Sequence, residues 1–551
     1  MNKNSMHPRF VRLLAPAIAG SIAILALSPA LAQGRHTIGL QAKYAQLWLE
    51  EGVDPHNPGN SDRFGSALAA GDFNGDGFAD LASGAPGNAC DPQEIRCGAV
   101  QVRMGAASAA LTSRIVLSPV PNSNDPANQD EGYGSALAAG DFNGDGRDDL
   151  AVGVPRNLVH AGVSLVPAGG LQLHFGLPSA LQPLQAIATY SFAEGALGVL
   201  PGTPSASEGF GHAVAFGDFN GDLKDDLAVG IPYDRNLCGA TPCAAGAVMV
   251  IDLDDNLSLG GYPMSLGRQG LPGLPAANDE YGYAVAAGDF DGDGYADLAT
   301  GIPQRDGVGA VLVVYGSEFS LLFGDHQLLD QGSFGELPEV GDGFGRTLSA
   351  GDFNHDGYAD LAMGAPGEDL AGAGQFNVGL VIVSYGSAGG LRLDGAPWLS
   401  EDGIFGSGSE SEDRFGSALT AGDWNGDGKT DLAIGAAGES GMAGAGSGAV
   451  TVILGRESGL AGSPSRQLSP GNSPIGMIAE RPGETDVFAS FGAELAAGDF
   501  DGNGFADLAI GAPERQLAPS ISVGAVGVVY GQFFLDGFDS GDALEWSGVT
   551  Q

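Results

Sequence analysis

A nine-residue acidic pattern, Asp-x-Asn/Asp-x-Asp/Asn-x-x-x-Asp, occurs seven times in this chain. The first aspartates of the seven copies are Asp72, Asp141, Asp218, Asp289, Asp352, Asp423 and Asp499. Subtraction of these positions gives steps of 63 to 77 residues. A regular period of this length is typical of folds built from repeated structural units. The pattern therefore predicts a repeat architecture with seven units.

Each copy has the spacing of a cation-binding loop. Oxygens at positions 1, 3, 5 and 9, with the carbonyl of position 7, can converge on one hard cation when a glycine at position 6 reverses the chain. Calcium accepts about six to eight oxygen ligands, whereas magnesium requires a tighter octahedron, so the pattern favours calcium. Asn-Gly and Asp-Gly pairs also form tight turns without a metal. Turns alone, however, do not require acids at positions 1 and 9.

The alignment predicts up to seven Ca²⁺ ions, and position 7 contributes only its backbone carbonyl. The predicted ligands are Asp72, Asn74, Asp76, Phe78, Asp80, Asp141, Asn143, Asp145, Arg147, Asp149, Asp218, Asn220, Asp222, Lys224, Asp226, Asp289, Asp291, Asp293, Tyr295, Asp297, Asp352, Asn354, Asp356, Tyr358, Asp360, Asp423, Asn425, Asp427, Lys429, Asp431, Asp499, Asp501, Asn503, Phe505 and Asp507. The third loop departs most from the pattern, because Leu223 occupies the turn-glycine position and a branched residue with positive φ is strained.

The segments around the loops predict strands. An EF-hand is excluded, because none of the seven copies has the glutamate that an EF-hand requires at position 12. Instead, Asp-Leu-Ala-x-Gly follows each loop, a short run typical of a strand, so the loops are expected on β-hairpins. Two further apolar runs in each unit bring the count to four strands. We therefore predict an all-β, seven-bladed β-propeller of four-stranded blades with calcium-binding hairpin loops.

These motifs resemble the FG-GAP repeats of the integrin α-chain N-terminal β-propeller. The resemblance rests on Phe64-Gly65, the loop from Asp72 to Asp80, Gly84-Ala-Pro86 and a later Gly-Ala-Val strand, and it recurs seven times. It implies a seven-bladed propeller, here assigned to residues 33–532, with calcium between the first two strands of a blade. Strand counting adds that a run at about 45–50 completes the last blade and closes the ring.

The ends of the chain predict export. Basic residues, an apolar stretch and Ala30-Leu-Ala32 mark residues 1–32 as a cleavable signal peptide. No later apolar run is long enough to span a bilayer, so the mature chain is expected to be secreted or to lie on the cell surface. Residues 533–551 form a short aromatic and acidic tail of open role.

Four cysteines fit an oxidising compartment. Cys90 and Cys97 fall in the variable stretch of the first unit, and Cys238 and Cys243 fall in that of the third. Two local disulfides are the simplest pairing. Metal ligation is the alternative, but neither pair has a neighbouring histidine.

Composition and motifs bound the function. The formal net charge of −44 disfavours nucleic acid and anionic membranes as partners. The sequence has no His-Glu-x-x-His motif and no thiol outside the expected disulfides. We therefore expect a monomeric, non-enzymatic adhesion or ligand-binding module for an extracellular protein or glycan. The alternative is a calcium-dependent lyase or hydrolase acting on polysaccharides, for which His212, at a position that can face the central channel, is a candidate residue.

Overall fold

The computed structural model describes residues 40–42, 45–49, 62–88, 97–107, 111, 114–119, 132–161, 164–178, 189–192, 204–235, 244–254, 258–268, 270–322, 324–369, 374–406, 408–440, 446–470, 490–518, 521–522 and 524–531. Contacts divide the chain into residues 1–38 and 39–551, and every described residue belongs to the second unit. Within the described part, strands dominate and the longest helix is α1 (Glu401–Phe405), so no helix there is of a length and apolarity that would carry it through a membrane.

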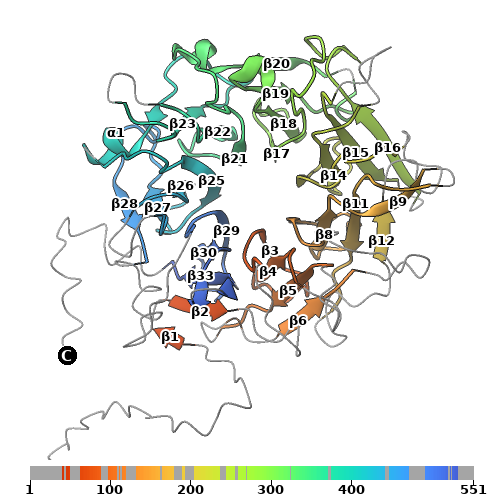
Figure 1. Ribbon diagram of the computed structural model, residues 1–551, viewed down its shortest axis with the longest axis horizontal. Coiled ribbons are helices and arrows are strands. Elements are labelled where there is room, and N and C mark those ends of the chain that lie inside the picture. Colours follow the sequence, from red (N-terminus) through yellow and green to blue (C-terminus); the bar gives the residue numbers. More distant parts are fainter. Residues whose placement is uncertain are drawn as a thin grey trace, which may run out of the picture. The chain divides into compact units, whose positions relative to one another are not determined.

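Six consecutive antiparallel sheets have four strands each, and the first strand of each sheet lies nearest the centre of the ring (Figure 1). The first three consist of β3 (Leu68–Gly71), β4 (Asp80–Ala85), β5 (Ala99–Arg103) and β6 (Arg114–Leu117); β7 (Ala136–Gly140), β8 (Asp149–Val154), β11 (Gly170–His174) and β12 (Thr189–Phe192); and β13 (Val214–Gly217), β14 (Asp226–Ile231), β15 (Ala247–Leu253) and β16 (Leu259–Met264). The next three consist of β17 (Val285–Gly288), β18 (Asp297–Ile302), β19 (Ala310–Val314) and β20 (His326–Leu329); β21 (Thr347–Gly351), β22 (Asp360–Ala365), β23 (Leu380–Ser384) and β24 (Trp398–Leu399); and β25 (Phe415–Gly422), β26 (Asp431–Ala436), β27 (Ala449–Ile453) and β28 (Ser465–Leu468).

The seventh sheet joins both ends of the described chain. Its strands are, in order, β29 (Glu494–Gly498), β30 (Asp507–Ala512), β33 (Ala525–Val529), β2 (Ala45–Leu49) and β1 (Leu40–Ala42). β2 pairs antiparallel with β33, from Ala45 opposite Val529 to Leu49 opposite Ala525. The N-terminal strand thus supplies the fourth strand of this blade, and β1 adds a fifth strand that the sequence did not predict.

The seven sheets form a closed ring. The first strands contact one another in the order β3, β7, β13, β17, β21, β25 and β29, and β29 contacts β3. The predicted seven-bladed β-propeller of four-stranded blades is therefore confirmed.

Small residues in the second strands allow neighbouring blades to approach closely. All six residues of β4 are buried. Leu81 is the only large apolar residue of this strand, and the residues after it, including Ala82 and Gly84, are small. A Cβ atom on Gly84 would lie 2.0 Å from the carbonyl oxygen of Gly134 in the next blade. The glycine that recurs in the second strand is therefore required by contact with the next blade.

Two extra hairpins extend the blades. β9 (Leu158–Ala161) pairs with β10 (Ser164–Pro167) between the second and third strands of the second blade, and β31 (Gln516–Ala518) pairs with β32 (Ile521–Ser522) in the seventh. The sequence predicted only a variable stretch there, because neither hairpin carries the repeat motifs.

Several predictions fall on other segments. The signal peptide at 1–32 and the tail at 533–551 lie outside the described residues, as do Cys90, Cys238 and Cys243. Cys97 is buried and disulfide-bonded. The pairing of the four cysteines stays a prediction.

Candidate functional site

The first aspartate of each acidic loop organises the turn between the first two strands. Asp72 Oδ1 accepts hydrogen bonds from the backbone N–H groups of Gly75 (2.8 Å) and Asp76 (3.1 Å), and its Oδ2 accepts one from Gly77 (2.8 Å). In all seven loops the N–H groups of positions 5 and 6 donate to this carboxylate. The first carboxylate therefore organises the turn through hydrogen bonds from the loop backbone in every blade.

The last aspartate of each loop is buried, and in five of the seven loops it accepts hydrogen bonds from two backbone N–H groups. Asp80 Oδ2 accepts from the N–H of Phe73 (3.1 Å), and its Oδ1 accepts from the N–H of Gly105 (2.8 Å) at the end of the third strand. The same donation comes from the corresponding glycines of five other blades, namely Gly176, Gly316, Gly386, Gly455 and Gly531. In the third blade Leu253 takes this place.

Sequence reasoning missed this glycine. Its signal is a second glycine seven residues after the glycine of the Gly-Ala-Val strand, as in Gly98 and Gly105.

Burial leaves the last aspartate in need of a positive charge. Burial, the first cause, and repulsion from the other acids raise its pKa against the effect of its hydrogen bonds. The pKa rises to about 8 for Asp80, Asp149, Asp226 and Asp507, and to about 7 for Asp297, Asp360 and Asp431. A cation among these oxygens would offset both effects.

The donor set fits a hard cation. In the fourth loop, Asp289, Asp291 and Asp297 each place one oxygen within 4.8 Å of the others, and the equivalent acids of the seventh loop do the same. In the first loop the third position is Asn74, whose buried Oδ1 has no hydrogen-bond partner. Acidic and amide oxygens, with no nitrogen or sulfur among the predicted donors, are the ligands that calcium prefers.

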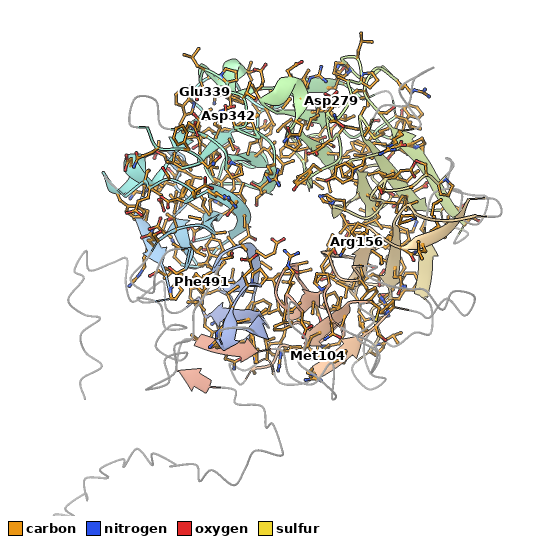
Figure 2. All side chains as sticks on the ribbon, viewed as in Figure 1. Met104, Arg156, Asp279, Glu339, Asp342 and Phe491 are labelled. Atoms are coloured by element: carbon orange, nitrogen blue, oxygen red, sulfur yellow. The ribbon has the colours of Figure 1, made fainter. Side chains whose placement is uncertain are left out.

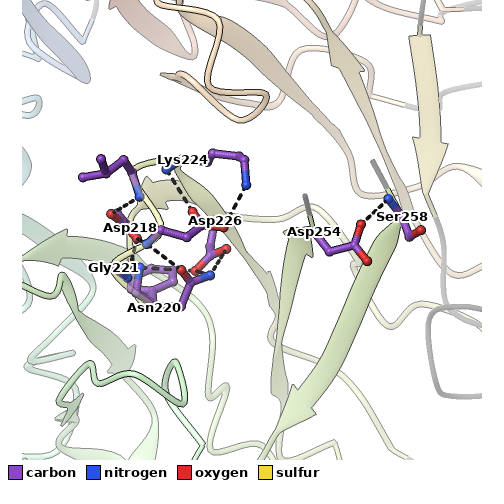
Figure 3. A network of polar contacts seen from close by, with 10 residues as sticks. Asp218, Asn220, Gly221, Lys224, Asp226, Asp254 and Ser258 are labelled. Atoms are coloured by element: carbon purple, nitrogen blue, oxygen red, sulfur yellow. Dashed lines mark hydrogen bonds and ion pairs between the residues drawn. The ribbon is translucent and has the colours of Figure 1, made fainter. Parts of the chain in front are cut away.

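Three loops carry a feature that the sequence did not predict. The basic side chain at position 7 pairs with the acid at position 5, at 2.6 Å in Arg147–Asp145 and at 3.0 Å in Lys224–Asp222 (Figure 3). Lys429 repeats the contact in the sixth loop. Each pair occupies one oxygen of a predicted ligand.

The third loop departs from the other six, as the sequence predicted. Leu223 has φ of +68° and its side chain is 89% exposed, so the expected positive φ is present and the leucine gains no burial in return. Its N–H still donates to Asp218 (2.9 Å). With Leu253 also replacing the glycine that supports Asp226, this loop has two departures from the shared geometry.

Hydrogen bonds link the seven loops into a continuous ring. The N–H of position 8 in each loop donates to the carbonyl oxygen of position 1 in the preceding loop, as Asp148 does to Asp72 (3.1 Å). The seventh bond, from Ala79 to Asp499 (3.0 Å), joins the first loop to the last. Each predicted cation site therefore shares backbone contacts with both neighbours.

A pocket lies at the opposite edge of the blades. The acidic loops follow the first strands, whereas the pocket residues precede a first strand or follow a second strand, and antiparallel pairing puts these segments at the other end. The pocket has a volume of about 500 Å³ and is bounded on one side by the β9–β10 hairpin. Its lining consists of Pro155, Arg156, Leu158, Pro167, Ser207, Gly209, His212 and Tyr233.

An aromatic and cationic row runs beside this pocket. The His212 ring lies 6.0 Å from that of Tyr233 and 4.7 Å from that of Tyr283, and the Arg346 guanidinium lies 4.7 Å above the Tyr283 ring. Burial, and to a smaller degree Arg346, lower the pKa of His212 to about 4. His212 is therefore a neutral imidazole at neutral pH. The exposed Arg156, labelled in Figure 2, lines the same pocket.

Comparison with known families matches every blade. The model of the FG-GAP repeat matches residues 64–94, 133–166, 210–251, 281–314, 344–383, 415–453 and 491–530. The chain is an FG-GAP repeat protein. Each match begins at the buried aromatic residue that opens a blade and includes the acidic loop, so this FG-GAP protein has one repeat per blade.

Relatives with FG-GAP-type similarity include integrin α chains. The chain is 34% identical over 254 residues to integrin alpha pat-2 of Caenorhabditis briggsae. The aligned region is 43% of this chain and 18% of the relative. It is 30% identical over 303 residues to integrin alpha-8 of Gallus gallus, covering 52% and 25%. It is also 35% identical over 173 residues to phosphatidylinositol-glycan-specific phospholipase D of Mus musculus, covering 31% and 18%. The shared region is thus a quarter or less of each relative.

Proposed function

We propose that this FG-GAP protein is a calcium-binding, extracellular adhesion or ligand-binding module. The observation that carries the proposal is the division of labour between the two ends of the blades. One end holds seven acidic loops, six of them of nearly identical geometry, and the other holds loops of varied sequence around a pocket. A uniform end suits structural cations, and a varied end suits recognition.

The acidic loops support calcium as the structural cation. Each loop brings several carboxylates together, and its last aspartate is buried with a raised pKa. Residues such as Asp297 and Asp507 would bind the ion together with the acids at positions 1 and 3 of the same loops. The bound ion would supply positive charge that neutralises these acids and fixes the hairpin.

The pocket supports a ligand that combines an apolar surface with negative charge. Leu158 and two prolines offer apolar contact, Tyr233 offers an aromatic ring, and the exposed Arg156 adds a guanidinium that already has a partner within the chain but carries donors for more than one acceptor, such as a carboxylate or sulfate. The chain has a net charge of −44, so the positive charge of Arg156 at the pocket differs from the acidic character of the rest of the chain. This charge favours acidic ligands. Acidic peptides and acidic glycans both have this chemistry, which agrees with the integrin α similarity as a guide to extracellular partners.

A binding assay tests the proposal. The purified chain without residues 1–32 is applied to arrays of glycans and extracellular proteins in calcium and in EGTA, and retention and breakdown of each ligand are followed. We expect retention in calcium, with at least tenfold weaker binding for Arg156→Ala. The control is Arg392→Ala, which removes an exposed arginine paired with Asp394 after β23 and should leave binding unchanged.

The same assay decides between binding and catalysis. Retention without breakdown supports a binding module. Breakdown of a polysaccharide would support the alternative, an extracellular lyase or hydrolase, and would overturn the non-enzymatic proposal. Equal retention of both arginine variants would place the binding surface away from the pocket.

A further inference from the structure

A second type of acidic cluster lies away from the seven loops. Glu401, Asp413 and Glu439, here called the acidic triad, each place one carboxylate oxygen within 4.8 Å of the others. Glu401 begins α1 after the outer strand of the fifth blade, Asp413 precedes the first strand of the sixth blade, and Glu439 follows the second strand of that blade. The triad therefore sits at the junction of two blades, at the edge opposite to the acidic loops.

Two acids of the triad are buried, Glu439 is half-buried, and a neighbouring base does not balance their charge. Glu401 is 2% exposed and Asp413 is fully buried. Within the described residues, no lysine or arginine forms an ion pair with the three acids, and the adjacent Arg414 pairs with Glu412 instead, at 2.8 Å. A buried carboxylate without a compensating charge is costly, and three together add mutual repulsion.

Each acid of the triad has one buried oxygen that faces the other acids. Glu401 Oε1 accepts from Gln467 Nε2 (3.0 Å) and Asp413 Oδ2 accepts from the N–H of Glu410. Within the described residues, no donor from outside the triad reaches Glu401 Oε2, Asp413 Oδ1 or Glu439 Oε2, which face the other carboxyl groups of the triad. A buried polar atom without a donor requires an explanation, and an ion bound at the atom is one. Three such oxygens in one cluster indicate a shared occupant.

The same place in the fourth blade holds a positive charge. Asp279 corresponds to Asp413, because each stands two residues before the buried aromatic residue that opens its blade. Arg305 corresponds to Glu439, four residues after the second-strand glycine, and the preceding N–H donates to the carbonyl of the partner aspartate in both blades. Arg305 Nη1 lies 3.9 Å from Asp279 Oδ2. In the fourth blade, the guanidinium of Arg305 therefore partly neutralises the buried carboxylate of Asp279.

In the fifth blade, an amide donates a hydrogen bond to the acids at the corresponding place. Gln331 begins a short 3₁₀ turn after β20, as Glu401 begins α1 after β24. Its Nε2 donates to Glu368 Oε2 at 2.6 Å, and the buried Asp342 interacts with both Gln331 and Glu368. Asp279 and Asp342 mark these corresponding places on neighbouring blades in Figure 2. The sixth blade has the carboxylate of Glu401 where the fifth has the amide of Gln331, so it lacks the amide donor that faces the other two acids.

We propose that the acidic triad of Glu401, Asp413 and Glu439 binds a divalent cation, calcium, as a structural site separate from the seven loops. Oxygens on opposite sides of a calcium ion are about 4.6 to 5.2 Å apart, so three oxygens within 4.8 Å can share one ion. The ion takes the role that the guanidinium of Arg305 has in the fourth blade and links α1 of the fifth blade to two segments of the sixth. A proton shared among the carboxylates is the competing occupant.

Exchanging Glu401 and Gln331 tests this site. Bound calcium per chain is measured at neutral pH by dialysis and atomic emission for the wild type, Glu401→Gln, Gln331→Glu and the control Glu412→Gln, which changes an exposed acid near the triad. We expect one ion fewer for Glu401→Gln, one ion more for Gln331→Glu and no change for Glu412→Gln. An unchanged ion count for Glu401→Gln overturns the proposal, whatever the loops bind.

Thermal melting separates the cation from the shared proton. With a calcium site, Glu401→Gln should melt higher than the wild type in EGTA, because it recreates the amide contact of Gln331, and should lose this advantage in calcium. An equal advantage in EGTA and in calcium indicates a shared proton and refutes the cation. Loop variants leave this comparison unchanged, so failure of the seven loops to bind calcium would be recognised separately.

Discussion

Removal of calcium should lower the melting temperature of the whole propeller by several degrees. If free calcium is ten times the dissociation constant, each bound ion contributes about 1.4 kcal/mol to the free energy of unfolding. Six loops share the complete geometry, and the third does not, so the six together contribute about 8 kcal/mol. A propeller of about 490 residues has an unfolding entropy near 1 kcal/mol per kelvin, which converts this loss into a shift of about 8 °C.

Scanning calorimetry in calcium and in EGTA, with magnesium as a control ion, measures this shift. A shift of only one or two degrees would refute the proposal that the loops hold structural calcium.

Replacement of single acids tests individual loops. Asp297→Asn removes a ligand from a complete loop, so it should lower the melting temperature in calcium and raise it in EGTA, where it removes a buried carboxylate whose pKa is raised to about 7. Asp226→Asn, in the third loop, should raise the melting temperature in both conditions, because the two departures of this loop weaken its calcium site. A lower melting temperature of this variant in calcium would show that the third loop binds calcium as the other six do.

Three further predictions concern the fold. Deletion of Ala45–Leu49 removes the fourth strand of the seventh blade and should sharply lower the melting temperature; an unchanged calorimetric transition would contradict closure by β2. Gly84→Ala should destabilise by several kcal/mol in urea unfolding, because its Cβ would lie 2.0 Å from the Gly134 carbonyl, whereas Gly77→Ala, with positive φ but no atom within 4 Å, should cost only about 1 kcal/mol. The pKa of His212 falls to about 4 in the folded state, so its contribution to stability is complete above about pH 6.5 and is lost as the pH falls toward 4. The difference in melting temperature between the wild type and His212→Asn should shrink over that interval, and a constant difference would exclude His212 as the titrating group.

The sequence predicted the parts of this structure that depend on local spacing. The seven loops, the strands beside them and the ring of blades follow from residues within about ten positions of each other, repeated seven times. Gly105 supports Asp80 from 25 residues away, and the ring of loop hydrogen bonds joins residues of successive blades. The residues that make these contacts are not separated by a fixed number of positions in the sequence. The contacts can therefore be identified only after the fold is known.

The acidic triad was missed for a different reason. Glu401, Asp413 and Glu439 belong to no motif, and as single residues in a chain rich in acids they are indistinguishable from solvated surface groups. Only their burial and their proximity set them apart. The comparison with Gln331 and Arg305 becomes possible once the corresponding places in the blades can be superimposed.

The pairing of β2 with β33 has a consequence for the order in which the molecule forms. Ribosomes synthesise β2 early, whereas its partner β33 is among the last strands made. The edge of β2 therefore stays unpaired while the other six blades form. If β2 of one molecule meets β33 of another during this interval, the seventh blade closes between chains and links them. Refolding at high concentration should therefore yield exchanged dimers and longer chains of propellers, whereas dilute refolding should yield closed monomers.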